Sequence, residues 1–253
     1  AEYIVEEIAL VHKRYNIDAV LVEDDLFTGD RKRVVALVDL LGKQGLLGKI
    51  SYYVAARAAQ LDDEWVALLK TLGVVKVELG IESGSNRIAA YLKTGKSSME
   101  INRDAISRLN RAGITVYAAF MAGAPPETME DLKQTWKMIK WIRRNHVYNT
   151  CGISVATPLP GTGLWDDAVA RGLMDPANMD WARLSSLSGT VNSPAGMVHI
   201  NRHMTAEALL KEVARMNFRM RLGTMRSFMA FLPRRLGKLK ARLTRKTAPA
   251  PLP

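Results

Sequence analysis

The chain has 253 residues, of which 48% are hydrophobic and 24% charged, the composition of an ordinary soluble globular protein. It contains no run of eighteen uninterrupted apolar residues, which excludes a transmembrane helix. Its one cysteine excludes an internal disulfide framework and fits a reducing cytoplasm.

The net charge of +11 is concentrated at the C-terminal end of the chain. Residues 213–253 carry eleven Lys or Arg and no acidic residue, which leaves 25 cations to balance the 25 acidic residues of positions 1–212. The body is therefore electrically neutral. The basic charge of the whole chain is not evidence that the whole protein binds nucleic acid.

Apolar stripes and capping residues predict helices and strands in alternation along the first two thirds of the chain. The predicted helices cover residues 2–15, 31–43, 62–72, 98–111, 127–144 and 163–171. Strands are predicted near 18–23, 50–55, 75–81, 114–121 and 152–157, all apolar on both faces. Such alternation indicates parallel strands joined by right-handed crossovers. The fold class is therefore α/β, either a (β/α) barrel, complete or partial, or an open doubly wound sheet.

The remaining segments are less regular. Residues 172–204 are rich in Asp, Asn, Ser, Pro and Gly, and a helix is predicted over 205–222. The basic tail after it ends in a Pro/Ala segment that is typical of disorder. Because a helix that opens such a series normally follows a strand, we expect one further strand upstream of Ala1.

Polar or turn-forming residues follow each predicted strand. They are Glu23-Asp24-Asp25, Arg57, Glu82-Ser83, Gly123-Ala124-Pro125-Pro126-Glu127 and Thr157-Pro158-Leu159-Pro160-Gly161-Thr162. In (β/α) barrels the carboxyl ends of the strands form the rim that holds the active site. Carboxylates can hold an ammonium group or ribose hydroxyls, and an arginine can hold a carboxylate through a bidentate fork. Gly-rich turns let the main chain approach a flat base, so the rim predicts a ligand site.

Each of these signals also has a structural explanation. Asp25 could equally cap the helix that follows it, and Glu127 could cap or open the helix 127–144. His199 and His203 have the i,i+4 spacing of metal ligands, but at a loop–helix junction surface or capping roles are the default. Cys151 opens a strand and is typical of a small core residue. The sequence contains no P-loop, no GxGxxG and no Ser–His–Asp order.

Four segments, in this order, resemble the core of radical S-adenosylmethionine enzymes, in particular the subgroup that carries an upstream cobalamin-binding domain. They are "VEDDLFTGDRKRV", "AARAAQLDDEWVALLKTLGVVKVELGIESGSNRI", "AAFMAGAPPETMEDLKQTW" and "ISVATPLPGTGLWDDAVARGLM". The resemblance implies a partial (β/α)6 TIM-like barrel whose first strand is missing or truncated, followed by a C-terminal helical basic tail. It divides the chain into a core barrel at 1–175, an extension at 176–222 and a basic, partly disordered tail at 223–253.

The family resemblance also implies a chemistry. In that family a CxxxCxxC loop holds a 4Fe–4S cluster, whose open iron is chelated by the amino and carboxylate groups of S-adenosylmethionine. Reductive cleavage yields a 5′-deoxyadenosyl radical that abstracts hydrogen from a substrate. The implied cofactors are S-adenosylmethionine, a 4Fe–4S cluster and, through an upstream domain, cobalamin. The implied partners are an electron donor such as flavodoxin or ferredoxin and a small-molecule or lipid-like substrate that the sequence does not identify.

The same resemblance implies roles for the rim residues. Asp24 and Asp25 would contact the methionyl amino group, and Arg57 its carboxylate. Glu82 and Ser83 would contact ribose or methionine, and the turns 123–127 and 157–161 would flank the adenine. The candidate cofactor-binding residues are Asp24, Asp25, Arg57, Glu82, Ser83, Gly123, Pro125, Glu127, Thr157 and Pro158.

The chain departs from the family pattern because it contains no CxxxCxxC motif. Since its first helix should follow that loop, we expect truncation rather than loss, and no radical chemistry from this chain alone. Two alternatives stay open: a non-catalytic barrel that lost its cluster and serves as a binding or scaffold module, and an unrelated (β/α) enzyme with a phosphorylated substrate. Three cysteines just upstream of Ala1 would favour the enzyme. The segment "PLPGTG" is too proline-rich for a good phosphate-binding turn.

The basic tail interleaves its cations with Met, Phe and Leu. Such a segment is typical of contact with an anionic membrane surface. We expect a cytoplasmic protein that the tail can bring to the inner face of the membrane. Nucleic-acid contact is a weaker prediction, because few aromatic residues are spaced for base stacking. The simpler alternative is a helix 205–222 packed on the barrel and followed by a solvated basic end.

Overall fold

The computed structural model describes residues 1–24, 26–93, 97–146, 148–179, 181, 184 and 197–222. The chain divides into two compact units, residues 1–213 and residues 214–253. The predicted tail, residues 223–253, lies outside the described residues. The sites considered below all belong to the first unit.

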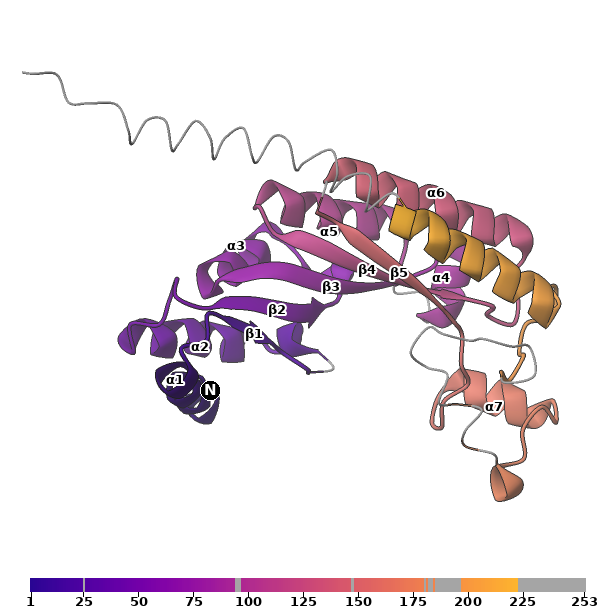
Figure 1. Ribbon diagram of the computed structural model, residues 1–253, viewed down its shortest axis with the longest axis horizontal. Coiled ribbons are helices and arrows are strands. Elements are labelled where there is room, and N and C mark those ends of the chain that lie inside the picture. The colour runs from indigo at the N-terminus through magenta and orange to yellow at the C-terminus, as the bar shows by residue number, and fades with distance from the viewer. Residues whose placement is uncertain are drawn as a thin grey trace, which may run out of the picture. The chain divides into compact units, whose positions relative to one another are not determined.

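A five-stranded parallel sheet forms the centre of the first unit (Figure 1). Its strands are β1 (Ala19–Leu21), β2 (Ser51–Ala56), β3 (Val74–Glu82), β4 (Thr115–Ala122) and β5 (Thr150–Val155). The order β1-β2-β3-β4-β5 follows the sequence without the reversal that a doubly wound sheet shows. The five predicted parallel strands are confirmed, and the sheet is a curled half-barrel of the TIM type.

Helices connect the strands as predicted. They are α1 (Glu2–Tyr15), α2 (Arg31–Lys43), α3 (Asp63–Leu72), α4 (Asn86–Leu92), α5 (Met99–Arg111), α6 (Met129–Asn145) and α7 (Gly163–Ala170), and a further helix covers residues 206–222. Short 3₁₀ turns are η1 (Phe27–Gly29), η2 (Ala58–Gln60) and η3 (Pro176–Asn178).

Capping residues set where these helices begin. Asp30, Asp62 and Ser98 each accept a hydrogen bond from the backbone N–H three residues later, at the start of α2, α3 and α5. Helix α6 begins at Met129 rather than at residue 127, because Thr128 is its N-cap and forms a capping box with Asp131. The capping role considered for Glu127 is therefore wrong.

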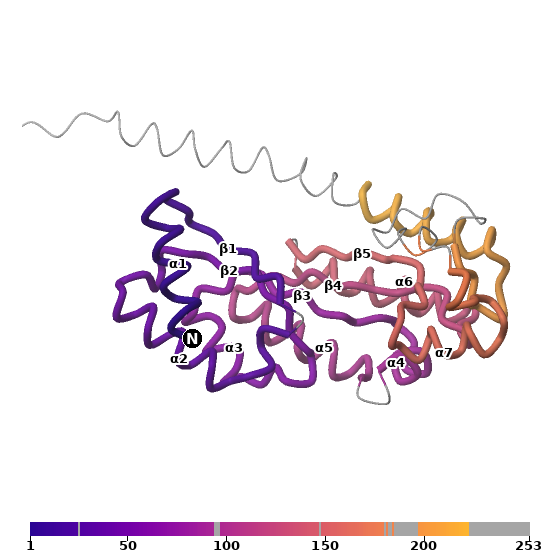
Figure 2. Tube along the Cα trace, turned by 90° about the horizontal axis from the view of Figure 1, so that it is seen from below, coloured from indigo at the N-terminus to yellow at the C-terminus, as the bar shows by residue number. Residues whose placement is uncertain are grey.

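The strands bury one face only. On β3 the side chains of Val77, Leu79 and Ile81 are fully buried, whereas Glu78 and Glu82 alternate with them and stay partly exposed. Helices α1, α2, α3 and α5 lie on one side of the sheet (Figure 2). The prediction that the strands are apolar on both faces is wrong for β3, because the face opposite its buried side chains carries Lys76, Glu78 and Glu82.

Candidate functional site

The carboxyl ends of the parallel strands meet at one rim, where the sequence places its candidate residues. Of these, the structure leaves Asp25 outside the described residues. Arg57 is exposed after β2, and Glu82 ends β3 with a side chain that is 15% exposed. Ser83, Gly123, Pro125, Glu127 and Pro158 are buried. The rim therefore separates into residues that a ligand can reach and residues that hold the turns.

Glu82 is the most unusual residue of the rim. Its backbone φ is 63°, a left-handed conformation that residues other than glycine rarely adopt, and the β3–β4 register shifts between Gly80 and Glu82. The distortion turns the carboxylate over Gly80, where it pairs with the Lys93 ammonium at 3.0 Å. A Cβ at position 80 would lie 2.5 Å from Glu82 Oε1, so a larger residue there would force the carboxylate out of this position.

A cavity of about 450 Å³ opens beside this ion pair. Its lining residues come from the end of β2, η2, β3 and the start of α5: Arg57, Ala58, Ala59, Gln60, Gly80, Lys93, Ser97, Ile101 and Asn102. The buried Gln60 Oε1 has no hydrogen-bond partner among the described residues. The cavity thus combines a guanidinium and an ammonium within the size range of small-ligand pockets.

Ser83, although it follows Glu82 directly, points away from this cavity. Its side chain is fully buried, and its hydroxyl lies 3.2 Å from the Thr135 hydroxyl of α6 and accepts the Ser85 N–H at 3.1 Å. Thr135 Oγ1 also accepts the Gly84 N–H at 2.9 Å. These bonds join the start of α4 to α6, so the structure gives Ser83 a role in holding the turn after β3.

Glu127 holds the turn after β4. Its side chain is 0% exposed, and Oε2 accepts the Gly123 N–H at 2.5 Å. Oε1 has no hydrogen-bond partner within the described part of the chain. Burial raises the pKa of Glu127 to about 7, and Asp131 adds to this rise, although the N–H groups of Gly123 and Ala124 oppose it. Gly123 itself has a φ of 93°, which favours glycine.

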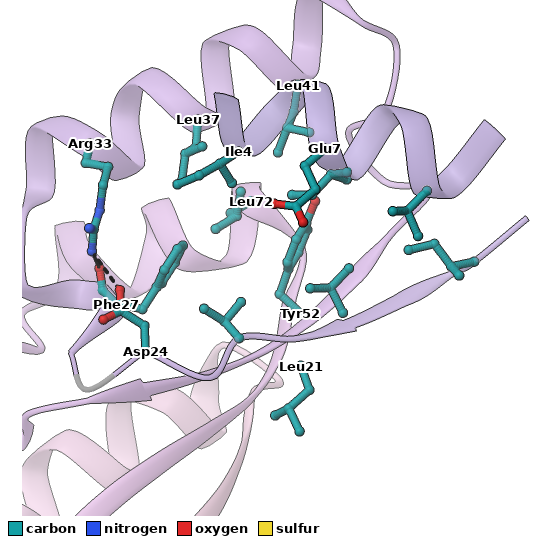
Figure 3. Close-up of a pocket in the computed structure, with 15 residues that line it drawn as sticks. Ile4, Glu7, Leu21, Asp24, Phe27, Arg33, Leu37, Leu41, Tyr52 and Leu72 are labelled. Carbon is teal, nitrogen blue, oxygen red and sulfur yellow. Dashed lines mark hydrogen bonds and ion pairs between the residues drawn. The ribbon is translucent and has the colours of Figure 1, made fainter. Parts of the chain in front are cut away.

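The two remaining described candidates lie at the outer strands. Asp24 pairs with Arg33 at 3.1 Å, and Arg33 also donates to the Phe27 carbonyl at 2.9 Å. This pair closes one end of a second cavity, of about 400 Å³, between α1, α2 and β1, which is mainly apolar (Figure 3). Thr157 is partly buried and donates to the Val155 carbonyl at 3.3 Å. The structure therefore places Arg57 in the lining of the first cavity and Glu82 beside it, paired with the lining residue Lys93, whereas Asp24 and Thr157 form hydrogen bonds elsewhere.

Sequence reasoning missed several residues of the cavity. Gly80 carried a signal, because a glycine inside a strand often marks a close approach by another group. Lys93, Gln60 and Asn102 gave none, since each follows the strand ends by a stretch of chain whose path only the fold determines.

The concave face of the sheet carries a further polar group below the rim. Tyr53 donates to Glu78 at 3.0 Å, and the Lys76 ammonium lies 5.0 Å and 5.7 Å from the ring centres of Tyr53 and Tyr117. Burial, with the Glu78 carboxylate beside it, raises the pKa of the Tyr53 phenol. A cavity of about 230 Å³ beside this group is lined by Glu23, Tyr53 and Glu78, among others.

A family model described as the radical SAM superfamily matches residues 1–139, more than half of the chain. The chain belongs to the radical SAM superfamily. The sequence resemblance and the partial barrel are thereby confirmed.

Relatives within the superfamily are longer than this chain. An uncharacterized methyltransferase from Pyrococcus horikoshii is 28% identical over 210 residues, which cover 83% of this chain and 42% of the relative. An anaerobic magnesium-protoporphyrin IX monomethyl ester cyclase from Rubrivivax gelatinosus is 26% identical over 139 residues, or 54% of this chain and 24% of the relative. The chain thus spans less than half of the length of either protein.

Solved structures share the fold. TsrM from Kitasatospora setae, a radical S-adenosylmethionine methyltransferase solved with its tryptophan substrate and a SAM analogue bound, has a TM-score of 0.55 and 16% identity, over 68% of this chain and 33% of TsrM. Elp3 from Methanocaldococcus infernus has a TM-score of 0.50 and 19% identity, over 66% of this chain and 44% of Elp3. At these identities the likeness concerns the radical SAM fold alone.

The residues of this radical SAM chain fit one family cofactor and not the other. The cavity beside Glu82, with the cations of Arg57 and Lys93 in its lining and the Glu82 carboxylate next to Lys93, suits the carboxylate, ammonium and hydroxyl groups of S-adenosylmethionine. A 4Fe–4S cluster needs several thiolates, and the chain has one cysteine. Burial raises the pKa of the Cys151 thiol to about 12, so it stays protonated.

In the described part of the chain, no three His, Cys, Asp or Glu side chains are grouped so that they could hold a metal ion. His199 forms a 2.8 Å hydrogen bond between Nε2 and the Met204 carbonyl, which fits the structural role expected of it. None of the described helices is both long and apolar enough to span a membrane.

Proposed function

We propose that this chain is the S-adenosylmethionine-binding body of a radical SAM enzyme, which cleaves S-adenosylmethionine reductively to a 5′-deoxyadenosyl radical and acts on a substrate still to be identified. The observation that carries the proposal is Glu82. Its carboxylate is held in a left-handed backbone conformation at the mouth of β3, over Gly80 and beside the cavity of Arg57 and Lys93. Strain of this kind is characteristic of functional sites.

The proposal gives the cavity residues separate tasks. Arg57 and Lys93 are the cations that would hold the carboxylate of the methionyl group. Glu82 would accept hydrogen bonds from the ammonium group or from ribose hydroxyls. Gly123, Pro125, Thr157 and Pro158 would contribute through the shape of the turns that flank the adenine. Asp24 would have to break its ion pair with Arg33 to contact the amino group, so we expect it to contribute less to binding than Glu82.

The cluster of this family supplies the electron that cleaves the sulfonium bond. Cys151 cannot supply its ligands, so we assign no step of that reduction to residues of this chain. We further propose flavodoxin or ferredoxin as the electron donor of the whole enzyme. Cobalamin enters the proposal only by family membership and by the fold shared with TsrM, which has been solved with cobalamin bound. The single cysteine keeps the alternative, a barrel that binds its ligand without radical chemistry, as the second candidate.

Titration of the chain with S-adenosylmethionine tests the proposal. Glu82→Ala should weaken binding by about 1–3 kcal/mol, the cost of losing hydrogen bonds to a charged group. Glu64→Ala is the matched control, because Glu64 is an exposed acid that pairs with Arg31 on the helix side of the sheet. Equal affinities of the parent chain and the Glu82 variant would remove Glu82 from the site, and a parent chain without measurable affinity would contradict the proposal itself.

The basic tail supports a separate proposal, contact with an anionic membrane surface. The support is its composition, since residues 223–253 add cations and apolar side chains without a single acid. Co-sedimentation with anionic and neutral vesicles tests it, with the full chain compared with residues 1–222. Loss of the anionic binding on truncation is expected, and equal binding of the two chains would contradict the proposal.

A further inference from the structure

The turn after β4 is held in place by a segment far along the chain, residues 197–204. The buried Asn201 side chain provides the link, because its amide donates to the Ala124 carbonyl at 2.6 Å and to the Glu127 carbonyl at 2.9 Å. Asn201 Oδ1 accepts the backbone N–H groups of His203 and Met204 at 2.8 Å and 2.7 Å. Both donors and both acceptor positions of the side chain are thus used by backbone groups.

Other contacts fasten the same segment to the turn. The Arg202 N–H donates to the Pro125 carbonyl at 3.1 Å. Leu209 lies so close to Gly123 that a Cβ there would meet its side chain at 2.5 Å. The backbone groups that fix the turn therefore bond mostly to the segment 197–209 and to Glu127, and not to β4 or its neighbours.

The segment is in turn anchored on α7. Arg171 donates to the Ile200 carbonyl at 2.7 Å and to Asp167 at 2.9 Å, and Arg202 pairs with the same Asp167 at 2.5 Å. Helix α7 begins directly after residues 157–161, the other turn of the rim. One short segment thus bonds both to the turn after β4 and to the helix that follows β5.

We infer that Asn201 is a positioning residue of the adenosyl part of the S-adenosylmethionine site, an inference that rests on the proposed function. Its side-chain hydrogen bonds fix the position of the turn Gly123–Glu127, and Asn201 itself does not contact the ligand. The sequence separates Asn201 from Ala124 by 77 residues, so residues beyond the predicted core at 1–175 complete the site. An aspartate at position 201 would keep the size and lose both donors, leaving the Ala124 and Glu127 carbonyls without them.

The test is a titration of the 253-residue chain and its Asn201→Asp variant with adenosine and with S-adenosylmethionine. We expect the variant to bind both ligands roughly tenfold more weakly, the factor that corresponds to one ordinary hydrogen bond. Arg57→Ala should weaken S-adenosylmethionine binding alone, because adenosine has no carboxylate. Asn178→Asp is the matched control, since Asn178 is exposed at the end of η3 and its amide donates to Asp175.

Amide hydrogen exchange separates positioning from general damage. In Asn201→Asp the amides of Gly123, Ala124 and Glu127 should exchange faster while those of β2 and β3 keep their rates. Asn201→Ser, a milder change, should accelerate exchange at the same amides but by a smaller factor. Unchanged adenosine affinity in Asn201→Asp would overturn the inference, as would faster exchange throughout the sheet in both variants. If the unaltered chain binds neither ligand, the proposed function fails and the inference fails with it.

Discussion

Glu82 is the last residue of β3 and Glu127 lies in the turn after the neighbouring strand β4, and the sequence marks both as candidate ligands of the cofactor. The Glu82 carboxylate pairs with Lys93, which lines a cavity, and the Glu82 backbone is strained. The Glu127 carboxylate is fully buried, lies close to the turn that it closes, and has a raised pKa. The comparison teaches that a glutamate at the end of a barrel strand can either present a charge to a ligand or shape the turn beside it.

The largest expected effect is a pH-dependent contribution of Glu127 to the free energy of unfolding. The Glu127 pKa is about 7 in the folded chain against an ordinary value of 4.5, so the folded protein holds this proton more tightly. The resulting stability is fully present below about pH 4.5 and is lost as the pH rises through 7. Glu127→Gln mimics the protonated group at every pH. Relative to the parent chain, it should therefore gain up to about 3 kcal/mol in the free energy of unfolding between pH 5 and pH 8.

Urea unfolding near both pH values measures this difference. Glu130→Gln is the control, because Glu130 is an exposed acid on α6 that pairs with Lys133. A constant difference between Glu127→Gln and the parent chain would show that Glu127 is charged in the folded protein, and the contrast with Glu82 would then disappear.

Ser83→Ala gives the next largest effect and sharpens the boundary of the site. The change removes a buried hydroxyl that accepts the Ser85 N–H and lies beside the Thr135 hydroxyl, so the free energy of unfolding should fall by about 1–2 kcal/mol. Affinity for S-adenosylmethionine should stay within about twofold. Ser107→Ala, at an exposed position of α5, should change neither quantity. Weaker binding at unchanged stability would return Ser83 to the ligand site.

The sequence was sufficient to predict the strands, most helix starts and the rim. These depend on local patterns, such as the apolar run of β3 and the caps Asp62 and Ser98. It could not distinguish Glu82 from Glu127, because the difference lies in partners that are remote in sequence or unmarked by any motif. Glu82 meets Lys93 only through the bulge at Gly80, and the turn of Glu127 meets Asn201 only through the packing of the segment after α7.

The smallest expected effect concerns the backbone strain at Glu82 and tests whether it serves the ligand. A side chain in the left-handed conformation costs roughly 1 kcal/mol that glycine does not incur, so Glu82→Gly should be about 1 kcal/mol more stable than Glu82→Ala. Both variants should lose affinity for S-adenosylmethionine equally, because both lack the carboxylate.

Glu78 supplies the matched comparison on the same strand, since among described residues other than glycine only Asn16 and Glu82 have a positive φ. At position 78 the order should reverse, with Glu78→Gly less stable than Glu78→Ala by roughly 0.5–1 kcal/mol. Thermal and urea unfolding of the four variants measure both differences. If glycine is destabilising at both positions, the backbone at Glu82 is not strained, and its conformation no longer argues for a function. If glycine is more stable than alanine at position 82 but less stable at position 78, and both variants at 82 lose affinity, the chain maintains a costly conformation in order to present this carboxylate.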